Sequence, residues 1–340
     1  MEVLNLINGS HLPAKSGDWL DLIDPSKGKS YGRIPRSSAE DVNLAVKAAR
    51  NAFESWSTMS AEKKSECIEK LADKIQEHAS MFAEAESRDN GKPIDLASTV
   101  DIPRAEKNLR FYASAIKHFA SESHYVEGVA INYTLRKPLG VVACISPWNL
   151  PLYLFTWKIA PALAAGNCVV AKPSEVTPAT AYLLSKWVKE AGFPDGVLNI
   201  LHGLGAEVGD ALVNHDDIAA VSFTGGTSTG AHIASAVAPK FKKLSLELGG
   251  KNAAVIFADC DFNEALSTTV RSSFANQGQI CLCGSRILVE RSIYEKFRDA
   301  LVEKAARIKV GNPLDPSTRM GAVVSEQHRD KILGHIEIAK

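Results

Sequence analysis

The sequence predicts an α/β protein built around a doubly wound, largely parallel sheet of the Rossmann type. From residue 139 onward, short runs rich in valine, isoleucine and alanine alternate with helical segments, the pattern of a parallel sheet covered on both faces. Polar or glycine-rich turns follow several of these runs, at the strand ends where ligands of such sheets bind. The 340 residues leave room for about two domains.

Composition excludes several other classes of protein. The chain is 45% hydrophobic and 23% charged, as globular proteins are, and its 39 basic and 39 acidic residues leave no broad basic field for nucleic acid. The N-terminus lacks the features of a signal peptide, and no apolar run is long enough to cross a bilayer. Six cysteines without a Cys-x-x-Cys pair indicate free thiols in a reducing cytosol. We therefore expect a cytoplasmic protein that partners neither nucleic acid nor membrane.

The N-terminal part is predicted to be mainly helical after an opening region of short strands. Residues 1–36 contain turn dipeptides that separate short strands. Ser37 and Glu40 match a capping box that opens an amphipathic helix ending near Trp56. Further elements expected here are helices over residues 60–88 and about 99–120, and a protruding hairpin or arm over residues 121–138.

The strands of the predicted sheet come next along the chain. Thr177 and Pro178 supply an N-cap and a first-turn proline for one intervening helix, and residues 192–194 (Gly-Phe-Pro) stop it. A run at residues 244–246 alternates as a strand does. The predicted strands are Leu139–Ile145, Cys168–Ala171, Val197–Leu201, Ile218–Phe223 and Ala254–Phe257.

Cys281 is a candidate nucleophile. It follows a glycine-bearing polar turn, residues 276–279, and precedes an apolar run, so the thiol lies between a predicted helix and a predicted strand. A cysteine of ordinary pKa is mostly protonated at neutral pH and needs a base or a nearby positive dipole to react. Inert packing is the alternative for Cys281, and it is the expected role of Cys283.

Glu247 and Asn149 are candidates for acid–base and electrostatic roles. Glu247 lies at a strand end beside two glycines, where a carboxylate could act as a general base, or could simply pair with Lys243 or Lys251. Asn149 follows a rigid Pro-Trp turn, where its amide could donate to an oxyanion, or could serve only the turn.

Lys172 and two glycine-rich turns indicate a dinucleotide site. Lys172 ends a predicted strand, where it could hold ribose hydroxyls or a phosphate, and Glu175 could accept from a ribose. Residues 223–227 (Phe-Thr-Gly-Gly-Thr) end a strand and open a helix, so their amides can approach a pyrophosphate. Residues 203–209 form a second glycine loop whose spacing departs from the usual fingerprint.

Metal and serine chemistry have little support in the sequence. The nine histidines are scattered, with no pair four residues apart beside a carboxylate, so no metal site is expected. Residues 226–230 match the G-x-S-x-G letters of a serine hydrolase around Ser228. The segment follows a Thr-Gly-Gly turn and is better interpreted as a phosphate turn.

Five ordered motifs resemble those of the aldehyde dehydrogenase family, over essentially the whole chain. The resemblance implies the family's fold: a Rossmann-type NAD-binding domain, an α/β catalytic domain that is incomplete here, and an oligomerisation arm. The motifs are Pro-Trp-Asn at 147–149, Lys-Pro-Ser-Glu at 172–175, Phe-Thr-Gly-Gly-Thr at 223–227, Leu-Glu-Leu-Gly-Gly-Lys at 246–251 and Asn-Gln-Gly-Gln-Ile-Cys at 276–281.

The resemblance also implies residue roles. Cys281 would form a thiohemiacetal with the aldehyde and then a thioester as hydride leaves to NAD, and Glu247 would activate the deacylating water. Asn149 and the backbone N–H of Cys281 would form the oxyanion hole. Glu175 would disfavour the extra phosphate of NADP. The implied NAD-binding set is Ser146, Trp148, Lys172, Glu175, Gly205, Gly209, Phe223, Gly225, Gly226, Gly230 and Leu248.

A narrower likeness, to the muconic semialdehyde dehydrogenases of this family, adds a substrate residue. In that subgroup an arginine matching Arg104 is implied to hold the substrate carboxylate, for which a bidentate guanidinium is suited. A surface or helix-capping arginine is the alternative. The implied partners are a carboxylate-bearing aldehyde, a muconic-type semialdehyde of tryptophan catabolism by this likeness, and further copies of the chain.

The resemblance also implies a division of the chain into domains. Residues 1–120 and 139–247 would bind NAD, 121–138 would form the arm, and 248–340 would form part of the catalytic domain. The chain stops inside a predicted helix, whereas family members continue with a Glu-x-Phe-Gly-Pro segment, a second arginine and an assembly strand. Two alternatives therefore stay open: an inactive shortened form, and a cofactor-independent thiol hydrolase that uses Cys281 and Glu247.

Overall fold

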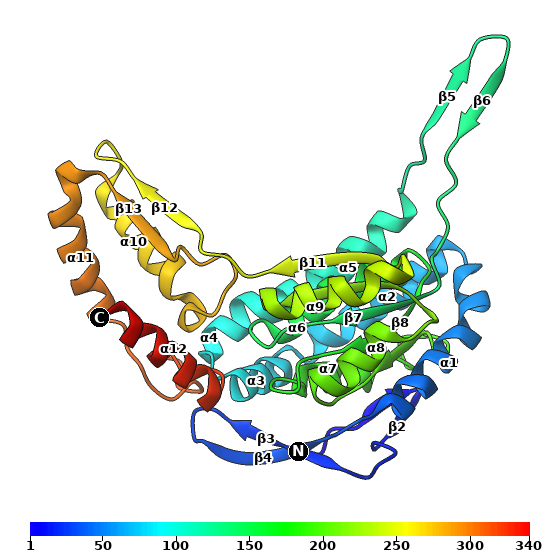
Figure 1. Cartoon of the computed structure of the whole chain (residues 1–340), viewed down its shortest axis with the longest axis horizontal. Coiled ribbons are helices and arrows are strands. Elements are labelled where there is room, and N and C mark those ends of the chain that lie inside the picture. Colours follow the sequence, from blue (N-terminus) through cyan, green and yellow to red (C-terminus); the bar gives the residue numbers. More distant parts are fainter.

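The computed structural model describes residues 1–340 and is organised around a seven-stranded sheet (Figure 1). Its strand order is β11-β10-β7-β8-β9-β1-β2, with parallel pairing from β11 to β9 and antiparallel pairing of β1 with β9 and β2. The expected parallel sheet is therefore confirmed for four of the five predicted strands, with an antiparallel edge added. The fifth, Ala254–Phe257, is wrongly placed by the prediction, because this segment pairs with residues 286–289 in a separate two-stranded sheet. The strands are β1 (Asn5–Ile7), β2 (Ser10–Leu12), β7 (Val141–Ile145), β8 (Cys168–Lys172), β9 (Leu198–Ile200), β10 (Ile218–Gly225) and β11 (Lys243–Leu248).

The central strands are buried on both faces, which is why they form continuous apolar runs. All residues of β7 and β8 are buried. One apolar core joins this sheet to the surrounding helices from Leu6 to Val237. The helices of this part are α1 (Ala39–Ser57), α2 (Ala61–Glu77), α3 (Ala79–Asn90), α4 (Ile94–Leu96), α5 (Ile102–Lys117), α6 (Pro151–Ala164), α7 (Ala179–Ser185), α8 (Asp210–Asn214) and α9 (Thr227–Val237).

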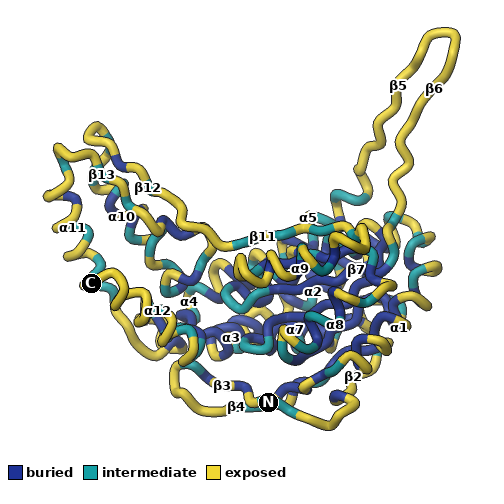
Figure 2. Tube along the Cα trace, in the orientation of Figure 1, coloured by how far each residue is buried: buried dark blue, intermediate teal, exposed yellow.

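Two hairpins lie outside the main sheet. β3 (Trp19–Asp24) pairs with β4 (Lys29–Pro35) beneath the helices, and β5 (Ser123–Val126) pairs with β6 (Ala130–Tyr133) in an arm that projects far from the body (Figure 1). Every residue of β5 and β6 is exposed (Figure 2). The arm predicted over residues 121–138 is confirmed as a hairpin.

The C-terminal segments form a smaller layer beyond β11, apart from the main sheet (Figure 1). β12 and β13 pair in parallel, and Ile256, Leu266 and Phe297 make a small separate core. The last helix returns to the main body, where the His328 ring contacts Trp148 at 4.8 Å between centroids. The elements are β12 (Ala253–Ile256), α10 (Phe262–Phe274), β13 (Arg286–Val289), α11 (Tyr294–Ala306) and α12 (Glu326–Ala339).

The predicted capping box is wrong by one residue. Ser38, not Ser37, is the N-cap of α1, and Asp41 supplies the reciprocal carboxylate, accepting from Ser38 N at 2.9 Å. The hydroxyl of Ser37 is buried and accepts instead from Asn5 Nδ2 at 2.7 Å. A tertiary hydrogen bond therefore removed Ser37 from the local competition for the cap.

Three other boundaries also differ from the prediction. The helix expected over 60–88 is two helices that break at His78, whose ring stacks on Trp187 at 4.6 Å between centroids. The helix expected from about residue 99 starts at Ile94 and passes through a π-helical turn at Ala97–Asp101. Thr177 does not cap α7, because its hydroxyl donates to the Trp148 carbonyl at 3.2 Å.

No helix has both the length and the apolar character needed to span a membrane. All six cysteines are free, and no cluster of three or more histidine, cysteine, aspartate or glutamate residues is arranged to hold a metal ion.

Candidate functional site

The main cavity lies at the carboxyl ends of β7, β8 and β10 and has a volume of about 850 Å³. This is the edge at which ligands of doubly wound sheets bind, and the volume is within the range of small-molecule and cofactor sites. Nine of the eleven residues predicted to bind the cofactor line it: Ser146, Trp148, Lys172, Glu175, Gly205, Gly209, Phe223, Gly225 and Gly226.

Lys172 and Glu175 form the polar floor of this cavity. The Lys172 side chain is 2% exposed, and its Nζ lies 3.0 Å from Glu175 Oε2 and donates to the Pro173 carbonyl at 3.0 Å. Burial alone would raise the pKa of Glu175, but the Lys172 ammonium and hydrogen bonds lower it overall. Glu175 is therefore an ionised acceptor at neutral pH, held in place by the lysine.

The glycine turn after β10 leaves open space for a ligand. Gly226 is the N-cap of α9, and a Cβ at Gly226 or at Gly205 would meet no other atom within 4 Å. The N-terminus of α9 therefore borders the cavity at a position where Gly226 adds no side chain, as an anion-binding helix start requires. Gly230 and Leu248 do not line it; they pack against each other, since a Cβ at Gly230 would lie 2.6 Å from the leucine side chain.

Sequence reasoning missed part of the cavity wall. Asp210 and His232 line it and are joined by a hydrogen bond of 2.8 Å between Oδ1 and Nε2. Ser228 is on the same wall but forms no hydrogen bond with His232. The serine of the G-x-S-x-G match therefore lacks the base that a hydrolase needs. The one sequence signal for this part of the wall is the spacing of four residues between Ser228 and His232, which puts both on one face of a helix.

Cys281 is the one exposed cysteine of the six. It follows three successive left-handed residues, Asn276, Gln277 and Gly278, with φ of 51°, 57° and 74°. Such backbone is costly for residues other than glycine and persists only when the surroundings hold it. Here the Cys281 carbonyl accepts from Asn252 Nδ2 at 2.7 Å. Cys283 is buried, and burial raises the pKa of its thiol, so its expected packing role is confirmed.

Asn149 links the cysteine loop to the main cavity. Its Nδ2 donates to the Gln279 carbonyl at 2.8 Å, and its own carbonyl accepts from Asn276 Nδ2 at 2.9 Å. Trp148, the residue before Asn149, is part of the cavity wall. Segments more than a hundred residues apart are therefore joined, and the loop that carries Cys281 is tied to the turn that borders the cavity, although Cys281 itself does not line it.

Glu247 faces a second, smaller cavity of about 250 Å³ under α6. Its carboxylate forms no ion pair, so the alternative pairing with Lys243 or Lys251 does not occur, and it forms no hydrogen bond with Cys281. Lys158 lines the same cavity and donates to Ser222 Oγ at 3.1 Å. Burial lowers the pKa of Lys158 to about 8, against the opposing influence of Cys144 and Glu247.

Arg104 lies on the first turn of α5 with an exposed side chain. Its guanidinium carbon is 5.9 Å from the centroid of the Tyr153 ring, and it has no carboxylate partner. An arginine without an internal ion pair remains available to an external anion.

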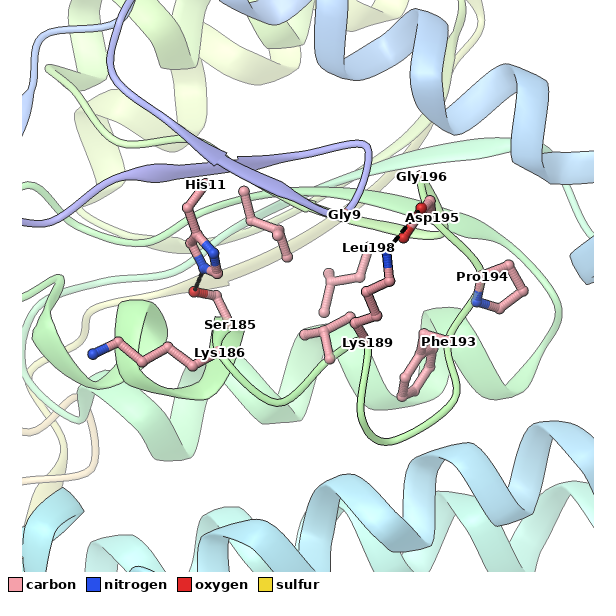
Figure 3. Close-up of a pocket in the computed structure, with 12 residues that line it drawn as sticks. Gly9, His11, Ser185, Lys186, Lys189, Phe193, Pro194, Asp195, Gly196 and Leu198 are labelled. Carbon is pink, nitrogen blue, oxygen red and sulfur yellow. Dashed lines mark hydrogen bonds and ion pairs between the residues drawn. The ribbon is translucent and has the colours of Figure 1, made fainter.

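A further cavity of about 220 Å³ lies between the β1–β2 hairpin and the turns after α7 (Figure 3). Its polar groups satisfy one another: Ser185 Oγ donates to the Tyr182 carbonyl at 2.6 Å and accepts from His11 Nε2 at 2.8 Å. Lys189 and Asp195 form an ion pair at 3.4 Å. The serine proton points away from the histidine, so this pair is not a nucleophile and base.

A large cavity at the strand ends of a doubly wound sheet, with a loop that carries an exposed thiol bonded to the turn at its wall, is the arrangement expected of cofactor-dependent oxidoreductases that work through a cysteine. Within that class the chain belongs to the aldehyde dehydrogenase family, whose sequence model matches residues 11–340.

Relatives within the family agree with this assignment. The chain is 52% identical over 336 residues to 2-aminomuconic semialdehyde dehydrogenase of Danio rerio, covering 98% of this chain and 69% of that protein. It is 42% identical to 2-hydroxymuconic semialdehyde dehydrogenase of Pseudomonas sp. strain CF600, covering 99% and 71%. The NAD+ complex of an aldehyde dehydrogenase from Bacillus cereus matches with a TM-score of 0.97 at 40% identity, covering 99% and 69%. The predicted family and fold are confirmed.

Proposed function

We propose that this chain oxidises an aldehyde to a carboxylate with NAD as the hydride acceptor, and that its substrate is a muconic-type semialdehyde of tryptophan or kynurenine catabolism. The observation that carries the proposal is the hydrogen bond from Asn149 to the Gln279 carbonyl, which ties the Cys281 loop to the wall of the main cavity. The relatives are named dehydrogenases, which favours oxidation over the hydrolase and inactive alternatives.

The main cavity fits a dinucleotide. Lys172 and Glu175 provide a buried cation and an ionised acceptor for ribose hydroxyls, and the helix N-terminus after Gly226 suits a pyrophosphate. Glu175 also disfavours an additional phosphate on the ribose, which supports NAD over NADP. When bound, NAD supplies the acceptor for the hydride that the substrate carbon loses.

The residues of the chain carry the remaining chemistry. The Cys281 thiolate adds to the aldehyde carbon, and the carbonyl oxygen becomes an oxyanion that the Asn149 amide and the Cys281 N–H stabilise. Loss of hydride from this thiohemiacetal leaves a thioester on the sulfur. Glu247 takes a proton from water, whose oxygen attacks the thioester carbon, and the carboxylate product leaves as the sulfur regains its electron pair.

A change in the site is implied by this scheme. The Asn149 amide donates to the Gln279 carbonyl in the structure, and Glu247 forms no hydrogen bond with Cys281. Substrate binding must therefore redirect the amide toward the oxyanion and bring a water between Glu247 and the thioester. Catalytic hydrogen bonds of this kind tighten only in the substrate complex.

We also propose a functional division of the chain. Residues 1–120 and 139–247 would bind NAD, 248–340 would form part of the catalytic domain, and the 121–138 arm would pair with another copy. The separate cores support the division, since one runs from Leu6 to Val237 and the other contains Ile256, Leu266 and Phe297.

The proposal is tested by following NADH formation from a muconic-type semialdehyde with purified protein. The Cys281→Ala variant should lose turnover by at least about a thousandfold, because it removes the nucleophile, while it still binds NAD. A Cys260→Ala variant is the matched control and should keep its rate. Turnover that survives in Cys281→Ala, or its absence from the unmodified protein, would count against the proposed function.

A further inference from the structure

A fully buried lysine lies behind the Pro-Trp-Asn turn. The Lys92 side chain has no exposed surface, and its ammonium contacts the Asp101 carboxylate and lies 3.5 Å from Glu86 Oε1. Glu86 is itself unexposed and Asp101 is 1% exposed. The third partner of the ammonium is not an acid: Lys92 Nζ donates to the Asn149 carbonyl at 3.1 Å.

Four side chains converge on the two carbonyls of this turn, and one of them is the Thr177 hydroxyl, which donates to the Trp148 carbonyl. Asn90 Nδ2 donates to the Trp148 carbonyl at 2.9 Å, while Lys92 and Asn276 both donate to the Asn149 carbonyl. Asn276 belongs to the cysteine loop, whereas Asn90 is the last residue of α3 and Lys92 lies two residues beyond it. The Asn149 carbonyl is thus the point at which the buried charges meet the loop that carries the thiol.

Stability alone does not account for the buried charges. Removing a lysine and two carboxylates from water costs several kcal/mol per ion, and apolar replacements of such groups are often equally stable. Burial, with Asp101 adding to it, raises the pKa of Glu86 to about 7, against the opposing effect of Lys92. What the three groups provide is orientation, because a charge-assisted bond fixes the carbonyl of Asn149 and therefore the start of its side chain.

We propose that Lys92, held by Asp101 and Glu86, is a positioning residue that orients Asn149 and, through it, the Cys281 loop. The inference rests on the proposed function, in which Asn149 stabilises the oxyanion. Lys92 touches neither thiol nor cavity wall, so it acts only through the turn.

A double-mutant cycle between Lys92→Met and Asn149→Ala tests the proposal. The Asn149→Ala change should lower kcat about a hundred- to a thousandfold. Lys92→Met alone should lower kcat about ten- to a hundredfold with little effect on KM, because a small misplacement of a catalytic group is costly. In the Asn149→Ala background the same lysine change should cost less than about threefold, since the two residues act as a unit. Additive losses would overturn the proposal.

A second measurement, the rate of Cys281 alkylation, does not depend on enzymatic turnover. Mass spectrometry follows alkylation of Cys281 by iodoacetamide, whose rate reports the geometry of the loop. Lys92→Met and Asn149→Ala should each change this rate, and the double variant should match Asn149→Ala. If the unmodified protein makes no NADH but this coupling is present, the proposed function fails and the positioning role stands. If alkylation is unaffected by Lys92→Met, the positioning role fails.

Two controls separate positioning from general loss of stability. Lys64 is 7% exposed and donates to the Ser57 carbonyl at 3.1 Å, away from the cysteine loop, so Lys64→Met makes the same chemical change without altering kcat or alkylation. A Lys92→Met/Glu86→Gln/Asp101→Asn variant removes the unpaired charges and should regain melting temperature but not kcat. Recovery of kcat along with stability would show a purely structural role.

Discussion

Two acidic side chains are buried close together on α3, and one of them predicts the pH dependence of stability. Tyr31 OH donates to Asp89 at 2.5 Å, and the Ala179 N–H donates to its other oxygen at 2.8 Å. Burial nevertheless raises the pKa of Asp89 to about 7, and Glu86 adds to the effect. The two hydrogen bonds of Asp89 join α3 to β4 and α7. Protonation of Asp89 is therefore linked to folding.

The native state should take up a proton at Asp89 between the unfolded pKa of about 4 and the native pKa of about 7. The stability linked to this proton is fully present below that interval and is lost as pH rises through about 7. The Asp89 proton contributes a slope of at most about 1.4 kcal/mol per pH unit, and Glu86, whose pKa is also raised to about 7, adds to the slope of the unmodified protein. Denaturant unfolding from pH 5 to 8 should show a flatter curve for Asp89→Asn than for the unmodified protein. Asp299→Asn, at an exposed position, is the control; an equally steep Asp89→Asn curve would contradict the assignment.

We expect Arg104 to select substrates that carry a carboxylate. Charge-assisted hydrogen bonds contribute roughly 1.5–3 kcal/mol, so Arg104→Met should raise KM about ten- to a hundredfold for a carboxylate-bearing aldehyde. The KM for a neutral aldehyde should not change, because no carboxylate is lost as a partner. Lys107→Met, an exposed change on the same helix, is the matched control. Equal effects on both aldehydes would rule out a carboxylate contact.

At the scale of elements, the cysteine loop is held by contacts with residues 321–324, which in turn lie against Gly91. Gln277 Nε2 donates to the Ala322 carbonyl at 2.6 Å, and Val324 N donates to Gln279 Oε1 at 3.0 Å. The same segment lies directly against Gly91, where a Cβ at Gly321 would overlap the Gly91 carbonyl. The loop is therefore held from both sides, by the Pro-Trp-Asn turn and by residues 321–324.

Replacement of Gly321 should loosen this arrangement. Gly321→Ala requires backbone to move and should destabilise the protein by about 1–3 kcal/mol. Gly334→Ala, inside α12 with nothing within 4 Å, should instead stabilise it by about 0.5–1 kcal/mol. Hydrogen exchange of residues 276–281 should become faster only in Gly321→Ala. Similar exchange in the two variants would show that the contact does not hold the loop.

At the scale of the whole molecule, the β5–β6 arm is exposed along its length (Figure 2), and several of its exposed residues are large and apolar. Val129 is 81% exposed and Ile131 is 71% exposed, well beyond the scattered apolar residues of ordinary surfaces. Its strands also leave unpaired edges, which invite pairing with a second chain.

Charged residues on the arm should therefore prevent self-association. Light scattering should show that the mass of the unmodified protein increases with concentration, whereas Ile131→Lys/Tyr133→Lys remains monomeric because burying a charge in the contact is costly. Val302→Lys removes an exposed apolar side chain of α11 and is the control. An arm variant that associates as the unmodified protein does would place the contact elsewhere.

Much of the fold follows from local patterns. The apolar runs of β7 and β8 require burial on both faces, and that requirement alone favours a parallel sheet between helices. Nine residues of the NAD-binding set that the family resemblance implies line the main cavity, and the Lys172 and glycine-turn part of this set also follows from strand ends that share one edge. The thiol was placed between a helix and a strand by the same kind of reasoning.

Long-range contacts decided the rest. Ser38 caps α1 instead of Ser37, because the Ser37 hydroxyl accepts a hydrogen bond from Asn5. Thr177 does not cap α7, because its hydroxyl donates to the Trp148 carbonyl. Gly230 and Leu248 pack together instead of lining the cavity.

The sequence by itself determined which chemical groups the protein has and on which strand ends and turns they lie. Only the tertiary structure decided that Lys92 is buried against the Asn149 carbonyl and that Asn149 donates to the loop of Cys281. The physical reason is that periodicity and turn chemistry act over a few residues. A hydrogen bond between residues far apart in the chain depends on the packing of every element between them.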